Sequence, residues 1–421
     1  MSVGTVAAPP STAPPPPTKR RITLPVALLG IAGLILLVAL IRVITGAEDL
    51  ASSGTLGAAV LLAMPIGMAG LGGLWAERAG VVNIGLEGMM ILGTWGAGFF
   101  GYQWGPWAGV LGAIAMGAVG GLIHAIATVG FGVDHIVSGV AVNIIGLGAA
   151  QYLAALTFTG TPGGGPTQSP PIGDLPVITV PGIASAAADL EAENWFFISD
   201  LASVVRALTA GISLLTVIAI GLVVLTWWVL WRTAFGLRLR SCGESPSAAE
   251  TLGVNVYRYK YIAVVISGGF AGLGGAFLAI VASSIYRDGQ TGGRGYIGLA
   301  AMIFGNWRPG GLLMGAGLFG FTDALQLRSG GESVHALLLL VGVGLLGLAV
   351  WQLRGSRRLA GLVTAGIAIA FLVWYLTTEE VPQDFSSMTP YVVTLLVLAL
   401  ASQRLRMPAA DGLPYRRGQG S

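Results

Sequence analysis

The stretch 231–260 reads WRTAFGLRLRSCGESPSAAETLGVNVYRYK and separates two long apolar segments of the chain. It is basic at both ends, and loops rich in Arg and Lys stay on the cytoplasmic side of a membrane. In its centre, Pro246 favours a helix start, the run 247–252 favours helix and Gly253 favours a stop. The stretch therefore predicts a cytoplasmic loop with a helix of at most about two turns, which needs further contacts to be stable.

The composition around this loop is that of a membrane protein. Hydrophobic residues make up 54% of the chain and charged residues 10%, 66 of 421 residues are Gly, and the mean hydropathy is +0.79. We therefore predict an all-α, polytopic integral membrane protein with closely packed helices. The net charge of +3 comes from Arg residues in short loops, which are topology signals and do not indicate nucleic-acid binding. With one Cys and three His, we expect no metal site and no catalytic constellation.

The length that a bilayer requires, ~20 residues, divides the chain into about 10–12 transmembrane helices. Their expected positions are 22–44, 57–75, 83–101, 107–129, 135–157, 208–231, 259–283, 295–306, 310–327, 335–353, 359–377 and 389–403. The basic loops then fall on one side, so we expect both termini in the cytoplasm. The predicted organisation is a disordered Pro-rich N-terminus (1–21), a transmembrane domain (22–405) with an acidic, turn-rich external loop (158–206) and the cytoplasmic loop 232–258, and a cytoplasmic tail (406–421).

Two short motifs resemble one another and indicate an inverted repeat. The motif IGLEGM at 84–89 is similar to IGLAAM at 297–302, and each is followed by Trp-x-Pro, at 104–106 and 307–309. In the predicted topology the first copy runs outward and the second runs inward, as in many transporters. The alternative interpretation is coincidence in a chain rich in Gly, Leu and Met.

Polar residues at membrane depth are the candidates for a translocation path, because burying them without a partner is costly. Glu87 is the first candidate, and its alternative role is an ion pair with Arg78 or a cap-like contact. Asn83 and Asn143 carry amide groups that can bond ribose hydroxyls or base edges. Their alternative role is hydrogen bonding between helices.

A second pair of candidates lies later in the chain. Asp323 and Gln326 are about one helical turn apart. They are expected to face a cavity, or to pair with Arg328.

Five segments resemble permease subunits of binding-protein-dependent ABC importers, in the branch for simple sugars, branched-chain amino acids and nucleosides. One of them, 236–276, is similar to the cytosolic coupling segment of this branch. The other four are similar to nucleoside permeases within it: 75–90 (WAERAGVVNIGLEGMM), 133–148 (VDHIVSGVAVNIIGLG), 293–311 (GRGYIGLAAMIFGNWRPGG) and 389–418. The resemblance implies a pore subunit that pairs with a second homologous permease, a cytosolic ABC ATPase and an extracytoplasmic substrate-binding lipoprotein, in the cytoplasmic (inner) membrane of a bacterium. It also implies that the loop 232–258 couples to the ATPase, through Gly243, Glu244, Ser245, Pro246, Ala248, Ala249, Glu250 and Gly253.

The chain departs from this pattern at two places. Residues 335–377 look like an inserted pair of helices, and the Pro-rich N-terminus is longer than the family suggests. No G-x-x-x-x-G-K-[ST] motif is present, because Lys19 and Lys260 are the only lysines. We therefore expect no cofactor in this chain, no enzymatic activity of its own, and ATP and Mg²⁺ in the partner ATPase.

Three functions remain open at this point. The first is an importer subunit that moves nucleosides by alternating access, and the second is the same machine with a simple sugar as its solute. The third is an ion-coupled secondary transporter, which an inverted repeat would also fit. A neighbouring ATPase gene, sibling permease gene and lipoprotein gene would favour the first two.

Overall fold

The computed structural model describes residues 24–355, 358–382, 385, 388 and 405–418. The regular secondary structure of this part of the chain is almost all helix, which confirms the all-α prediction. Its helices are α1 (Leu24–Thr45), η1 (Glu48–Leu50), α2 (Ser53–Arg78), α3 (Leu86–Trp104), α4 (Pro106–Ala125), η2 (Ile126–Gly130), α5 (His135–Phe158), α6 (Ile183–Ala192), α7 (Ile198–Ala207), α8 (Leu214–Arg232), α9 (Ala234–Glu244), α10 (Pro246–Thr251), α11 (Val256–Ala276), η3 (Phe277–Ala282), α12 (Arg294–Phe304), α13 (Pro309–Arg354) and α14 (Arg358–Thr377). Two short strands, β1 (Val177–Ile178) and β2 (Ile212–Ser213), pair antiparallel.

Seven helical segments of the described residues are long and apolar enough to cross a membrane. They are 48–78, 106–130, 135–158, 214–232, 256–282, 333–354 and 358–377. The prediction of a multi-pass membrane protein is confirmed. The predicted disordered terminus 1–21 and most of the last predicted span, 389–403, lie outside the described residues.

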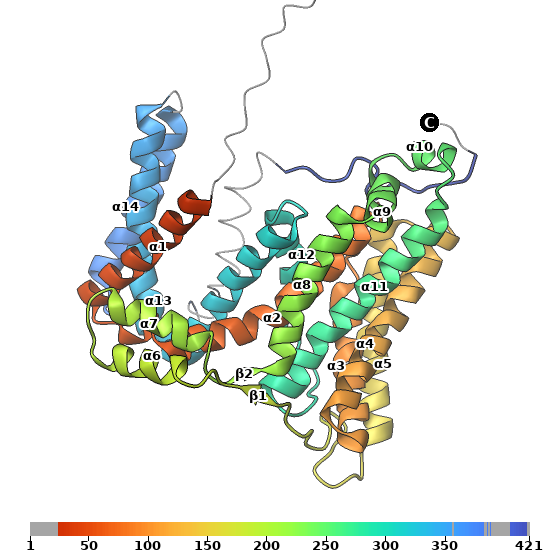
Figure 1. Cartoon of the computed structure of the whole chain (residues 1–421), viewed down its shortest axis with the longest axis horizontal. Coiled ribbons are helices and arrows are strands. Elements are labelled where there is room, and N and C mark those ends of the chain that lie inside the picture. The colour runs from red at the N-terminus through yellow and green to blue at the C-terminus, as the bar shows by residue number, and fades with distance from the viewer. Residues whose placement is uncertain (1–23, 356–357, 383–384, 386–387, 389–404, 419–421) are drawn as a thin grey trace, which may run out of the picture.

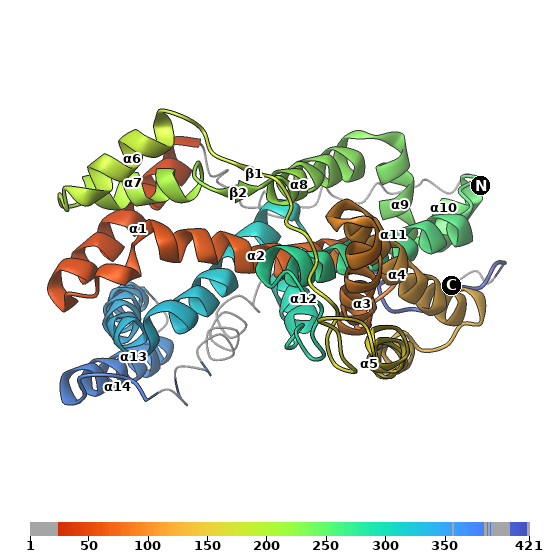
Figure 2. The ribbon, with the colours of Figure 1, turned by 90° about the horizontal axis from the view of Figure 1, so that it is seen from below.

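Helix α2 is the central element of the bundle, and α11, α12 and α13 pack directly around it (Figure 2). Glycines make this packing close. A Cβ on Gly70 would lie 2.6 Å from the carbonyl oxygen of Gly298, and a Cβ on Gly274 would lie 2.8 Å from that of Pro65. Backbones that approach this closely require small residues, as is common between membrane helices.

The two ends of the bundle differ (Figure 1). One end carries α9, α10 and the segment 405–418, and we call it the α10 end. The other carries α6, α7 and the β1–β2 pair, and we call it the α6/α7 end. The predicted loop 158–206 lies at the α6/α7 end and is more helical than expected, because α6 and α7 form within it. The Ala-rich run 183–192 (IASAAADLEA) explains α6, since Ala has the highest helix propensity.

The two copies of the repeated motif lie on helices that run in opposite directions. Along α2, Gly70 lies against Gly298 and Gly73 lies against Met302, so α12 runs parallel to α2. Helix α3 runs antiparallel to α2. Its first residue, Leu86, packs against Gly73 near the C-terminal end of α2, and α3 continues away from that end. The directions are those predicted for an inverted repeat.

Helix α13 differs from the sequence prediction. The spans expected at 310–327 and 335–353 belong to one continuous helix of 46 residues. At 1.5 Å per residue it is ~69 Å long, more than twice the ~30 Å hydrocarbon core, so it is too long for a single straight crossing. Its second half packs against α14 (Figure 1), and the predicted two-helix segment 335–377 corresponds to this half together with α14.

Candidate functional site: the helix junction and the coupling loop

The N-termini of α3 and α12 meet inside the bundle, and we call this place the helix junction. Glu87, in the first turn of α3, is 6% exposed. Its two carboxylate oxygens accept hydrogen bonds from the backbone N–H groups of Gly293 (2.9 Å) and Gly295 (2.6 Å). The first N–H groups of a helix have no partner within the helix and carry partial positive charge. Glu87 therefore caps α12 and neutralises the partial positive charge of its N-terminus. The predicted alternative of a cap-like contact fits this geometry, whereas Arg78 contacts Trp307.

Asn143 of α5 closes the other half of the helix junction. Its side-chain oxygen accepts a hydrogen bond from the N–H of Gly88 (2.7 Å), at the start of α3. Its side-chain nitrogen donates to the carbonyl oxygen of Ile84 and to the hydroxyl oxygen of Tyr296, each at 3.0 Å. The two predicted path residues Glu87 and Asn143 are thus brought together through the starts of α3 and α12.

Two of the other predicted path residues, Asn83 and Asp323, form contacts within the helix bundle. Asn83 is fully buried, and its side-chain nitrogen donates to the hydroxyl oxygen of Ser267 on α11 at 2.8 Å. This contact fits the alternative role of Asn83, hydrogen bonding within the bundle, and not solute binding. Asp323 forms an ion pair with Arg294 at 2.9 Å rather than with the predicted Arg328. Gln326 is half-buried on α13.

One side of the helix junction is open. Tyr296 is 46% exposed, and its hydroxyl group bonds Asn143 well inside the length of α5. Further along α5, the exposed Gln151 donates a hydrogen bond to Asp288 at 2.9 Å. Exposed polar groups within a membrane-spanning helix are costly against lipid and usually line a cavity or a protein interface. This face of α5 and α12 is therefore the candidate wall of a path.

The coupling loop, residues 232–258, forms two helices, α9 and α10. Helix α10 begins at Pro246, as predicted, and the chain leaves it through Gly253, whose φ of +80° favours Gly. Ala249 is buried, and a Cβ on Gly243 would lie 3.0 Å from the carbonyl carbon of Arg78. Helix α9 was not expected. It makes the loop a compact platform on the end of α2.

The outer surface of this platform is exposed. Glu244, Ser245 and Ala248 are exposed, and Leu252 is 85% exposed. A leucine that is almost fully exposed beside small residues leaves room for a partner surface to approach. The predicted coupling residues thus divide into buried ones that hold α10 and exposed ones that a partner can reach.

The C-terminal segment 405–418 binds this platform, and we call it the tail. The Tyr415 hydroxyl donates to Glu250 at 2.6 Å, and the Arg417 guanidinium lies 3.2 Å from the same carboxylate. The Tyr415 hydroxyl holds the pKa of Glu250 below its usual range, with a smaller effect of Arg417. The N–H of Ala410 donates to the carbonyl oxygen of Gly243 at 2.8 Å. Sequence analysis did not identify Tyr415 or Arg417.

A buried polar cluster at the α10 end was also missed. Glu77 accepts a hydrogen bond from the indole N–H of Trp307, and the Arg78 guanidinium donates to the carbonyl oxygen of Trp307 at 2.7 Å. Lys260 donates to the carbonyl oxygen of Gly80 at 3.1 Å. Asp411 of the tail lies beside Glu77, and burial raises its pKa to about 7. This cluster ties the tail to the end of α2.

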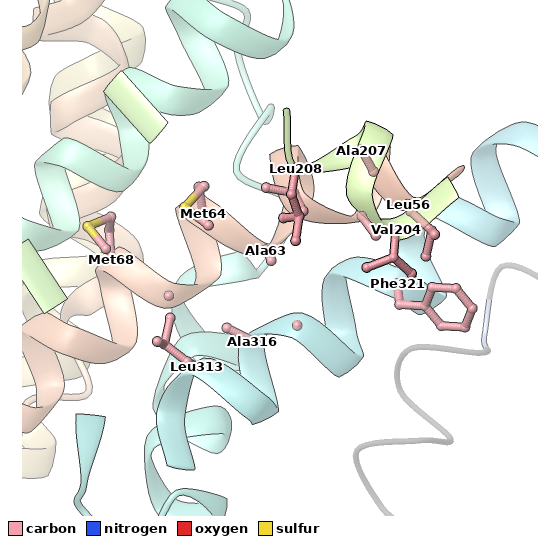
Figure 3. A pocket seen from close by; sticks show the side chains of 14 residues that line it. Leu56, Ala63, Met64, Met68, Val204, Ala207, Leu208, Leu313, Ala316 and Phe321 are labelled. Carbon is pink, nitrogen blue, oxygen red and sulfur yellow. The ribbon is translucent and has the colours of Figure 1, made fainter. Parts of the chain in front are cut away.

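An apolar cavity of about 290 Å³ lies elsewhere, between α2, α7 and α13 (Figure 3). Met64 and Met68 of α2, Val204 of α7 and Leu313 of α13 are among its lining residues. None of the predicted path residues lines it. Its walls offer almost no hydrogen-bond partners, so it suits a hydrocarbon chain better than a polar solute.

An all-helical, multi-pass bundle with exposed polar residues at membrane depth is typical of membrane transport proteins. The comparisons with known proteins are more specific. Residues 55–347 match the family described as branched-chain amino acid transport system / permease component, and the chain belongs to this family. It is therefore a permease component and not an enzyme, and the predicted resemblance is confirmed.

Individual relatives cover most of the chain. The guanosine ABC transporter permease protein NupQ of Bacillus subtilis is 34% identical over 86% of this chain and 96% of its own length. The nucleoside ABC transporter permease protein NupC of Lactococcus lactis is 32% identical over 85% and 94%. A protein of Haloferax volcanii, provisionally named as the glucose ABC transporter permease protein TsgC13, is 33% identical over 87% and 98%. No solved structure matches the chain.

Proposed function

We propose that this chain is the permease subunit of an ATP-driven nucleoside importer in the cytoplasmic membrane of a bacterium. In this proposal it pairs with a second homologous permease subunit, a cytosolic ABC ATPase and an extracytoplasmic substrate-binding lipoprotein, with membrane lipid around it. The chain contributes the path, and ATP and Mg²⁺ bind to the ATPase. Two relatives that match over at least 85% of this chain are named as nucleoside or guanosine permeases, which supports the solute class.

The orientation follows from the charges of the two ends. The α10 end carries Arg232, Arg238 and Arg258 of the coupling loop and basic residues of the tail. At the α6/α7 end, Glu191 and Asp200 are paired with Arg206 and Arg42, and the further acidic residues Asp189 and Glu193 make this end less basic than the α10 end. Because basic loops stay inside, we place the α10 end and both termini in the cytoplasm.

The state of the helix junction is the structural observation that best supports an uncharged solute. A helix N-terminus inside a transporter often binds an anionic group of the solute. Here the Glu87 carboxylate already occupies the N-terminus of α12 through Gly293 and Gly295. A second carboxylate, such as that of an amino acid, would meet like charge, whereas a nucleoside or sugar is neutral.

The open face beside the helix junction supplies groups that suit a nucleoside. The amide of Asn143 can bond ribose hydroxyls if its contact with Tyr296 is exchanged for the solute, and the Tyr296 ring can stack on a base. Alternating access then requires movement of α12 or α5, since both contribute to this face. In our proposal the ATPases drive this movement by pushing on the exposed residues of α10.

Uptake of radiolabelled solutes tests the proposal. Cells with and without the gene are supplied with uridine, adenosine, ribose or leucine, and the ATP supply and the ion gradients are collapsed separately. We expect nucleoside uptake that depends on the gene and on ATP. Uptake of ribose alone would favour the sugar importer, for which the relative named after glucose provides a precedent, and uptake that follows an ion gradient would overturn the ABC assignment.

A further inference from the structure

The tail connects three parts of the α10 end that are far apart in sequence. In Figure 1 it is the dark-blue segment that passes α9 and approaches α10. At its start the N–H of Arg406 donates to the Asn306 side chain in the turn between α12 and α13, at 2.8 Å. In its middle Asp411 is buried against the end of α2. At its end Tyr415 and Arg417 hold Glu250 of α10.

Helix α10 depends on these tail contacts for its position. It has six residues, of which only Ala249 is buried, and a helix this short is not stable alone. The Tyr415 ring also packs on the Tyr257 ring of α11, with centroids 5.4 Å apart. The hydrogen bond from the Tyr415 hydroxyl to Glu250 is charge-assisted and therefore stronger than a neutral one, whereas the exposed Arg417 adds less. The tail thus holds α10 mainly through Tyr415.

Only a short piece of the tail lies between its contacts with α2 and with α10. Four residue steps separate Asp411 from Tyr415, which span at most ~14 Å when fully extended. Asp411 is buried beside Glu77 at the end of α2 and the Tyr415 hydroxyl bonds Glu250 of α10, so a displacement of α10 larger than this short piece can absorb acts on α2. Helix α2 is the central helix of the bundle and contacts α12 at Gly298.

We propose that the tail acts as a strut, which transmits displacement of α10 to α2 and to the α12–α13 turn. Tyr415 and Arg417 are its positioning residues, since they act through Glu250 and not on the solute. This inference rests on the proposed function, because it takes α10 as the element that an ATPase moves. It predicts that the tail determines how much solute moves for each ATP hydrolysed.

The test uses the complete transporter in liposomes, with the double variant Tyr415→Phe and Arg417→Gln. We expect the ATPase to copurify as with the wild type and to hydrolyse ATP at a similar rate, while uridine transported per ATP falls by about tenfold, because the charge-assisted hydrogen bond from Tyr415 to Glu250 is lost and the exposed Arg417 contributes little. Arg417→Lys should recover part of the ratio, because it keeps the charge. Arg416→Gln is the matched control, since Arg416 is exposed and forms no hydrogen bond or ion pair with the described residues.

An unchanged ratio of uridine to ATP in the double variant would overturn the strut. Loss of the ATPase from the complex would also overturn it, since the tail would then be an assembly contact. Absence of ATP-driven uridine transport by the wild type would instead contradict the proposed function. In that case hydrogen exchange of the purified full chain still tests the tail: exchange at 246–253 should be faster in the double variant and unchanged at 86–104, and equal exchange at 246–253 would overturn the inference.

Discussion

The helix junction and the α10 end are held together in different ways. At the helix junction, Glu87 bonds backbone N–H groups of another helix, and it is 6% exposed. At the α10 end, Glu250 bonds side chains of the tail, and Leu252 nearby is 85% exposed. Backbone contacts fix a geometry more tightly than contacts between long side chains. The difference indicates a centre held by backbone contacts, which we call the rigid centre, and an α10 end held by side-chain contacts.

The largest expected effect is on binding of the ATPase to the α10 end, and it should leave the folding of the chain unchanged. If α10 contacts an ATPase as proposed, Leu252→Asp should reduce ATP-dependent uptake to the background level, because a charge would be buried in that contact without a partner. The unfolding temperature of the chain itself should not change, since Leu252 is exposed. Leu413→Asp, at an exposed leucine of the tail, is the control. Equal effects of both variants on copurification of the ATPase would contradict a specific role for α10.

The second prediction compares a buried cap with an exposed cap. Glu87→Gln should lower the free energy of unfolding by about 1–3 kcal/mol, because only one amide oxygen remains for two buried N–H groups. Asp134 also caps a helix, through the N–H groups of Ile136 and Val137, but it is exposed. Asp134→Asn should cost less than about 0.5 kcal/mol, since Asn caps nearly as well as Asp. Denaturant titration in detergent measures both, and a similar cost for the two variants would show that the helix junction is not specially dependent on Glu87.

The third prediction concerns the close packing of the rigid centre. Gly70→Ala should cost about 1–3 kcal/mol, because its Cβ would lie 2.6 Å from the carbonyl oxygen of Gly298. Gly221→Ala on α8 meets no atom within 4 Å and should stabilise the chain by up to about 1 kcal/mol through helix propensity. The unfolding temperatures of the two variants should therefore shift in opposite directions. A stable, fully active Gly70→Ala variant would contradict close α2–α12 packing.

The local features of this structure were predictable from the sequence. Apolar length indicated the membrane spans, and the pattern of Pro246, Ala-rich residues and Gly253 placed α10 close to its observed bounds. Helix α12 begins one residue before its predicted start. These features depend on residues close together in the chain, where propensity and capping decide the conformation.

The partners of the polar residues were not predictable in the same way. Glu87 caps a helix that lies 206 positions later in the sequence, and Tyr415 bonds Glu250 across 165 positions. The local sequence around a carboxylate does not predict which distant helix N-terminus it will contact. The tail was predicted as a cytoplasmic end and as part of the segment 389–418 that resembles nucleoside permeases, but no contact of its Tyr, Arg or Asp residues was predicted. Its role becomes visible only when it lies beside α2 and α10.

The smallest expected effect is a pH dependence at the α10 end, where Asp411 of the tail lies beside the end of α2. Asp411 faces Glu77 and Arg78 of α2 and Lys260 of α11, and burial raises its pKa to about 7 from the ordinary value of ~3.9. An acid whose pKa is raised on docking binds more tightly when protonated. Docking of the tail should therefore weaken as the pH rises from ~4 to about 7 and stay constant above that.

Limited trypsin cleavage of the tail of the purified chain measures this dependence, since Arg416 and Arg417 are cleavage sites that docking protects. The wild type should be cleaved several-fold faster at pH 8 than at pH 6, after correction for the pH dependence of trypsin on a free peptide of the same sequence. Asp411→Asn should remove the difference, because the amide stays neutral over this range. If wild type and Asp411→Asn keep the same ratio of rates, Asp411 does not control docking, and the tail is held by its other contacts, among them the backbone hydrogen bond to Gly243 of α9.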